Sequence, residues 1–129
     1  MDKGLSSRIS LPGASAAVSD WYSTSHLFCL PSRWEGFPNA LAEALAHGLP
    51  SVGFAGCAGV PDLILPGENG LLAEGNGEVN ALAKALENLM ASADKRRAMG
   101  ARAAESVKGY DPDKVFSLWE RVLAEATLS

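Results

Sequence analysis

Short apolar runs that alternate with helical segments constrain this chain more than any other feature of its sequence. Three runs are typical of buried strands, at residues 27–30, 51–54 and 70–73. Pro38 can open a helix between the first two runs and Gly48 can close it, and residues 60–65 can form one or two further turns. Such alternation predicts an α/β, Rossmann-like fold, a parallel sheet with helices on both faces.

The same pattern predicts where a ligand would bind. In open α/β sheets, ligands bind just beyond the carboxyl ends of the strands. The loops that directly follow the three predicted strands are residues 31–37, 55–59 and 74–77. We therefore expect any functional site to lie at these loops.

Further elements flank this central stretch. Residues 8–11 alternate in polarity and are closed by proline and glycine, which predicts a short strand, and residues 15–25 have a helical face. Three helices follow residue 78; Asp94 is the expected N-cap of the second, and the third begins at Asp111 and Pro112. The last helix has an apolar stripe, which we expect to dock on the rest of the domain; it comprises Val115, Phe116, Trp119, Val122, Leu123 and Ala126.

Composition limits the partners and the compartment. The 129 residues, 47% of them hydrophobic, are enough for one domain with a core. A net charge of −4 leaves no basic face that would hold nucleic acid or an anionic membrane. Cys29 and Cys57 are expected as buried, unpaired thiols. There is no apolar run of roughly 20 residues and no signal-peptide core, so the cytoplasm is the expected compartment.

The loop after the first of the three apolar runs has the features of an anion site. Residues 31–37 lead directly into the helix that Pro38 opens, and a helix amino terminus offers unpaired N–H groups and partial positive charge. Gly36 lets the backbone approach a phosphate closely. On the helix, a polar stripe of Asn39, Glu43 and His47 lies opposite the apolar residues Leu41, Ala44 and Leu45.

Each of these residues also has a simpler explanation. Glu43 on its own is more often a solvated helix residue, and Glu35 can merely complement the helix dipole. Arg33 can be a solvated side chain or a cation for a phosphate, and His47 suits a helix end. Glu35 and Glu43 lie at opposite ends of more than one helical turn, so they cannot share one proton as a catalytic pair. No metal-ligand spacing occurs.

Two longer stretches favour the functional interpretation. Residues 31–50, PSRWEGFPNALAEALAHGLP, resemble the E-x7-E region of glycosyltransferase family 4, the GT-B enzymes that use nucleotide sugars. Residues 59–72, which include GVPDLI and GENGLL, are similar to the next segment of that family. Their order and spacing agree with the family, and the resemblance extends from about Arg8 to Leu123.

The resemblance implies roles for the loop and the helix. Glu43 would bind the ribose hydroxyls of the nucleotide, the backbone from Phe37 through Pro38 to Asn39 would face the diphosphate or the sugar, and Glu35 would contact the donor sugar. Transfer in this family retains the anomeric configuration, and the donor is a nucleoside diphosphate sugar that needs no metal or other cofactor.

The resemblance also implies that residues 1–129 form a partial, C-terminal donor domain. Family members have an acceptor domain and, at the start of the donor domain, an Arg and a Lys that neutralise the diphosphate, and the sequence has neither region. The predicted strand at residues 8–11 would lack its usual neighbour, so it would be loose, compensated in another way, or paired with another molecule. Ala58 stands where the family more often has glycine.

Two hypotheses of function follow. The first is a part of a retaining glycosyltransferase that binds the donor and is inactive in isolation. The second is a non-catalytic module, derived from such an enzyme, whose helices serve assembly. A dinucleotide-dependent oxidoreductase is disfavoured because no G-x-G-x-x-G follows a predicted strand.

Overall fold

Three parallel strands form the centre of the molecule. The computed structural model describes residues 3–128 and contains β1 (Phe28–Leu30), β2 (Ser51–Phe54) and β3 (Gly70–Ala73) in the order β1-β2-β3. Cys29 lies opposite Val52, and Val52 lies opposite Leu71. The predicted strands and their parallel arrangement are confirmed to within one residue.

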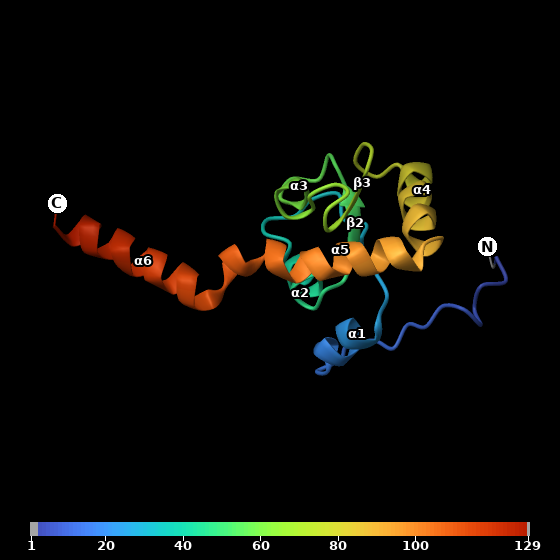
Figure 1. Cartoon of the computed structure of the whole chain (residues 1–129), viewed down its shortest axis with the longest axis horizontal. Helices are drawn as coiled ribbons and strands as arrows, with labels where there is room; N and C mark the ends of the chain where they lie inside the picture. Colours follow the sequence, from blue (N-terminus) through green and yellow to red (C-terminus); the bar gives the residue numbers. More distant parts are fainter. Residues whose placement is uncertain (1–2, 129) are drawn as a thin grey trace.

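Helices surround this sheet (Figure 1). They are α1 (Val18–Thr24), α2 (Asn39–Ala46), α3 (Val60–Leu63), α4 (Val79–Met90), α5 (Ala93–Ser106), the short 3-10 helix η1 (Lys108–Tyr110) and α6 (Pro112–Thr127). Adjacent residues of a strand point to opposite faces of the sheet, and in β2 both faces are covered by helices. Val52 packs with Leu89 of α4, whereas Gly53 faces Val60 of α3. The predicted α/β class is confirmed.

Helix α2 is anchored by its buried side and by its end. Leu41, Ala44 and Leu45 are completely buried, as the sequence pattern predicts. The helix ends before Gly48, whose φ of 75° favours glycine. A Cβ atom on Gly100 of α5 would lie 2.5 Å from the Gly48 carbonyl oxygen, so α5 crosses the end of α2 in close backbone contact.

The strand predicted at residues 8–11 does not form. The amide of Arg8 donates to the Leu5 carbonyl in a turn, and residues 9–11 belong to no strand. Ile9 is 56% exposed and Leu11 is 89% exposed, so the apolar side chains of this run pack against no described part of the molecule. Self-association through the edge of this predicted strand therefore has no strand to form on, and the edges of the described sheet are β1 and β3.

The prediction that α6 docks on the domain is also wrong. Figure 1 shows α6 pointing away from the sheet, and no residue of this helix is buried. Phe116 and Trp119 are 63% and 60% exposed. The apolar stripe is real, but the turn at residues 107–111 directs it away from the domain, and periodicity does not specify direction.

The helix caps agree with the sequence in part. Helix α6 begins at the predicted Asp111–Pro112 pair, and Asp111 caps it, because its carboxylate accepts from the Asp113 amide at 3.0 Å. Ser92, rather than Asp94, caps α5; its hydroxyl accepts from the Lys95 amide at 3.2 Å. Asp94 instead pairs with Arg97 within the first turn.

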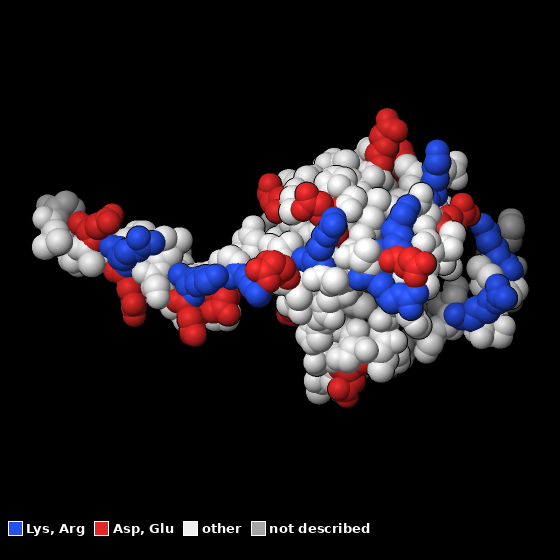
Figure 2. Space-filling view, in the orientation of Figure 1, with Lys and Arg blue, Asp and Glu red and all other residues white. Residues whose placement is uncertain are grey.

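Charge is mixed along the surface. On the face shown in Figure 2, basic and acidic side chains are interspersed over the body and along α6. None of the described helices is long and apolar enough to cross a bilayer. The face in view thus has no continuous basic stripe for a polyanion.

Candidate functional site

The three strand-end loops meet at the carboxyl edge of the sheet. The Gly56 amide donates to the Gly75 carbonyl at 2.8 Å, which joins the second loop to the third. Gly59, with a φ of 84°, lies against the first loop; a Cβ atom there would be 3.0 Å from the Gly36 carbonyl oxygen. The three loops therefore lie together as predicted, and glycine backbone forms the contacts of the second loop with the first and the third.

Arg33 is fixed between the first and third loops. The Asn76 side-chain amide donates to the Arg33 carbonyl at 2.9 Å, and the Arg33 guanidinium lies over Gly77, where a Cβ atom would clash with it. Arg33 nevertheless remains exposed to solvent. Its charge therefore lies at the carboxyl edge of the sheet, in contact with solvent.

The backbone at the start of α2 offers fewer free amides than the sequence predicts. The helix begins at Asn39, one residue after the predicted start at Pro38, which is buried and has no N–H. The Asn39 amide already donates to the Phe37 carbonyl at 2.9 Å. Within residues 3–128, the amides of Gly36 and Phe37 have no hydrogen-bond partner. An anion at this helix end would thus meet Gly36 and Phe37 rather than Asn39.

Glu43 lies on the exposed side of α2, as the polar stripe predicts. Its Oε2 atom accepts a 3.4 Å hydrogen bond from the Tyr22 hydroxyl of α1. The same hydroxyl is 3.3 Å from the Ala40 carbonyl oxygen. Burial, followed by the negative charge of Glu43, raises the pKa of Tyr22.

His47 ends the polar stripe and joins α1 to α2. Its Nδ1 atom is 2.9 Å from the Glu43 carbonyl oxygen, and its Nε2 atom is 2.9 Å from the Ser19 hydroxyl. The ring also packs against Tyr22 at 5.1 Å between centroids. A structural role at the helix end is therefore confirmed for His47.

Glu35 faces a different neighbour from Glu43. It is half-buried, and its charge helps to raise the pKa of the buried Cys57 thiol, after the larger effect of burial. Glu35 therefore faces the loop after β2, while Glu43 faces α1, and the two carboxylates are not a pair. Cys57 and the half-buried Cys29 are both free thiols, as predicted.

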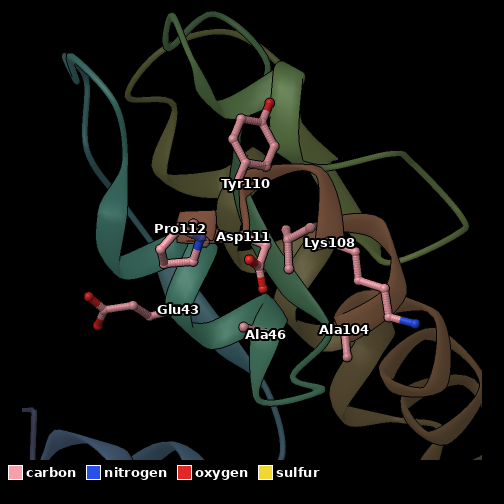
Figure 3. A pocket seen from close by; sticks show the side chains of 9 residues that line it. Glu43, Ala46, Ala104, Lys108, Tyr110, Asp111 and Pro112 are labelled. Atoms are coloured by element: carbon pink, nitrogen blue, oxygen red, sulfur yellow. The ribbon is translucent and has the colours of Figure 1, made fainter. Parts of the chain in front are cut away.

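A groove of about 360 Å³ runs beside Glu43 between α2 and residues 107–112 (Figure 3). Lys108, Tyr110 and Asp111 line its far side. Figure 3 shows the Glu43 carboxylate turned away from Lys108 and Asp111. Glu43 thus lines this groove on the α2 side, while its carboxylate contacts Tyr22 of α1.

Two aromatic side chains lie in the loop that precedes α2. Phe37 is 47% exposed and packs against Tyr110, with 5.3 Å between ring centroids and an angle of 49° between the rings. Trp34 is 81% exposed. Phe37 thus presents its amide to the helix end while its ring contacts η1.

The second family-like stretch has a structural part. Asn69 is fully buried; its Oδ1 atom accepts from the Leu65 amide at 2.8 Å, and its Nδ2 atom donates to the Leu63 carbonyl at 2.9 Å and to the Ser106 hydroxyl at 2.8 Å. Asn69 therefore holds the loop before β3 against α5. It makes no contact that would address a ligand.

Sequence reasoning missed three residues that the fold brings to this region. Tyr22 falls on the apolar face of the helix predicted at residues 15–25, whereas its hydroxyl reaches Glu43 from 21 positions away. Asn76 reaches the Arg33 carbonyl across 43 positions, and Tyr110 reaches Phe37. No local pattern indicates such contacts, because they depend on how α1, β3 and η1 pack.

The fold is a Rossmann-like α/β domain, and in such open parallel sheets ligands bind at the carboxyl edge. The family model described as "Glycosyl transferases group 1" matches residues 1–92. The chain belongs to this family, which is the family 4 that its E-x7-E region resembles.

Relatives and a solved structure agree with this assignment. An uncharacterized glycosyltransferase of Haemophilus influenzae is 34% identical over 106 residues, which are 82% of this chain and 30% of that protein. The D-inositol 3-phosphate glycosyltransferase of Kribbella flavida is 33% identical over 87% of this chain and 24% of its own length.

Sucrose-phosphate synthase from Thermosynechococcus elongatus has a similar structure, with a TM-score of 0.82 and 26% identity over 97% of this chain and 31% of that one. The chain thus spans about a third or less of these proteins.

Proposed function

We propose that this chain is the donor-binding part of a retaining glycosyltransferase and binds a nucleoside diphosphate sugar at the carboxyl edge of its sheet. The observation that carries the proposal is the segment from Glu35 to Glu43. It has two free amides, of Gly36 and Phe37, just before α2 and the exposed carboxylate of Glu43 one turn after the start of that helix. This segment belongs to a chain of the group 1 glycosyl transferases.

Each part of the segment suits one part of the donor. The amides of Gly36 and Phe37 and the guanidinium of Arg33 would hold the diphosphate, because a helix amino terminus and a nearby cation both favour anions. Glu43 would accept hydrogen bonds from the two ribose hydroxyls, since a carboxylate can accept two at once. Glu35 would contact the sugar and act at the reacting end of the donor.

The acceptor and the remaining parts of the reaction are proposed to lie outside these residues. The chain covers 30% of the Haemophilus influenzae relative and 24% of the Kribbella flavida relative. We infer that these 129 residues bind the donor without turning it over in isolation, and that binding needs no metal. Similarity to proteins such as a lipopolysaccharide core mannosyltransferase of Rhizobium meliloti supports a role in polysaccharide or glycoconjugate synthesis.

The proposal is tested by titrating the chain with UDP, GDP and ADP and measuring heat or NMR shifts. Replacing Glu43 by alanine should weaken the tightest of these about ten- to a hundredfold, because charge-assisted bonds are worth about 1.5–3 kcal/mol. Glu87→Ala, at an exposed site on α4, is the matched control and should leave affinity unchanged. An unchanged affinity in Glu43→Ala would exclude the ribose assignment.

Two further titrations separate the proposed roles. Glu35→Ala should weaken binding of a nucleoside diphosphate sugar while leaving the bare diphosphate unaffected, because Glu35 is assigned to the sugar. Adding EDTA should change neither affinity. A loss of diphosphate binding in Glu35→Ala, or a loss in EDTA, would contradict these assignments.

A second candidate function is a non-catalytic assembly module, and the exposed stripe on α6 favours it. Phe116, Trp119 and Leu123 are each about 60% exposed, an unusual density of apolar surface on one helix. Size-exclusion chromatography with and without nucleotide distinguishes the two functions. Stable self-association together with no nucleotide binding would favour the assembly module.

A further inference from the structure

Helix α1 packs against the side of α2 that carries Glu43. Three hydrogen bonds join them: Ser19 to His47 at 2.9 Å, the Tyr22 hydroxyl to the Ala40 carbonyl at 3.3 Å, and the same hydroxyl to Glu43 Oε2 at 3.4 Å. The contact to Glu43 reaches the carboxylate itself. The other two involve the backbone or the histidine ring of α2.

The Tyr22 ring is held rigidly enough to act as a fixed donor. It is 9% exposed, although the rest of α1 is largely exposed. Phe28 of β1 packs edge-on to it at 6.0 Å, and the His47 ring packs on it at 5.1 Å. His47 is itself held by Ser19 and by the Glu43 carbonyl. These contacts direct the hydroxyl toward the Ala40 carbonyl and the Glu43 carboxylate of α2.

We propose that Tyr22 is a positioning residue for Glu43, and that its hydroxyl orients the carboxylate for the ribose of the donor. An exposed glutamate has several side-chain rotamers, and ordering it on binding costs conformational entropy. A hydroxyl that holds Oε2 limits these rotamers beforehand and leaves Oε1 and the remaining lone pairs for the ligand. This inference rests on the donor-binding function proposed for Glu43.

The inference predicts a modest and specific effect. A single hydroxyl proton is shared between Glu43 Oε2 and the Ala40 carbonyl, at long distances, so its loss should weaken nucleoside diphosphate binding about three- to tenfold. Tyr22→Phe removes the hydroxyl and keeps the ring packed. Ser23→Ala is the matched control, since it removes an exposed hydroxyl of α1, which donates to the Ser19 carbonyl at 2.9 Å, without touching the carboxylate.

The experiment titrates the 129-residue chain and its variants with UDP, GDP and ADP, and then with the 2′,3′-dideoxy form of the tightest binder. Tyr22→Phe should weaken the ribose form and leave the dideoxy form unchanged, because the dideoxy sugar offers nothing for Glu43 to bind. In a Glu43→Gln background, Tyr22→Phe should cause a clearly smaller loss. A merely structural role of Tyr22 would lower the affinity for the ribose form and for the dideoxy form equally.

Three results would overturn the inference. Equal losses for the ribose and dideoxy forms would assign Tyr22 to packing alone. Unchanged ribose affinity in Tyr22→Phe, with Glu43→Ala impaired, would leave the proposed function intact and remove Tyr22 from it. Failure of the unmodified chain to bind all three diphosphates would overturn the proposed function and this inference with it.

Discussion

Replacing Asn69 by alanine should destabilise the chain by about 3 kcal/mol. Its side chain is fully buried and makes three hydrogen bonds, to Leu65, Leu63 and Ser106, at 2.8 to 2.9 Å. Each such bond contributes about 1 kcal/mol net, and the Leu63 carbonyl left behind is buried. For a domain of this size, the loss corresponds to a fall in melting temperature of roughly 10 °C.

The measurement is urea and thermal unfolding followed by circular dichroism, with Asn88→Ala as the control. Asn88 is exposed, and its side chain accepts one hydrogen bond from Lys95, so its replacement should change stability by no more than about 0.5 kcal/mol. A second variant, Asn69→Asp, preserves the volume and puts an acceptor where the Leu63 carbonyl needs a donor.

Asn69→Asp should therefore be at least as destabilising as Asn69→Ala. If it proves neutral, or if Asn69→Ala costs less than about 1 kcal/mol, then the hydrogen bonds of Asn69 do not hold the loop and the reasoning is refuted.

Three further predictions concern stability. Gly100→Ala should cost about 1–3 kcal/mol, because the new Cβ meets the Gly48 carbonyl, whereas Gly109→Ala, with open space around it, should cost almost nothing in the same unfolding assay. Burial raises the pKa of Cys57, so the folded chain holds that proton more tightly. The free energy of unfolding should be level below about pH 8 and fall above about pH 9, and Cys57→Ala should reduce the fall between pH 7 and 9.5 in urea titrations. Trp119→Ser should leave the unfolding free energy within about 0.5 kcal/mol of the parent, since this side chain is 60% exposed; a larger loss would mean that α6 docks on the domain in solution.

Helix α2 shows how much of the site the sequence specifies. Leu41, Ala44 and Leu45 repeat at helical spacing and are buried, so the opposite face, with Glu43, is exposed by necessity. The loop before it follows from Pro31 and Gly36, and the parallel order of the strands places that loop at the carboxyl edge. These are local rules, and for this stretch they sufficed.

The failures have a common physical cause. Residues 8–11 alternate as a strand should, but a strand exists by hydrogen bonds to a neighbour, and none of the described segments supplies one. The stripe on α6 is as apolar as a docking face, but the chain direction at residues 107–111 decides what it meets. In both cases the apolar pattern is present in the sequence, but the described residues provide no neighbouring strand or surface for it to pack on.

The sequence by itself determined the strands, the helices, the α/β class and the placement of Glu35 and Glu43 at the two ends of one segment, because these depend on side-chain period and on residues near in the chain. The tertiary structure alone decided that Tyr22 reaches Glu43, that Asn76 fixes Arg33, and that the Asn39 amide is already occupied. Those contacts are set by how separate elements pack, and packing depends on the shape of the whole core, which no local pattern encodes.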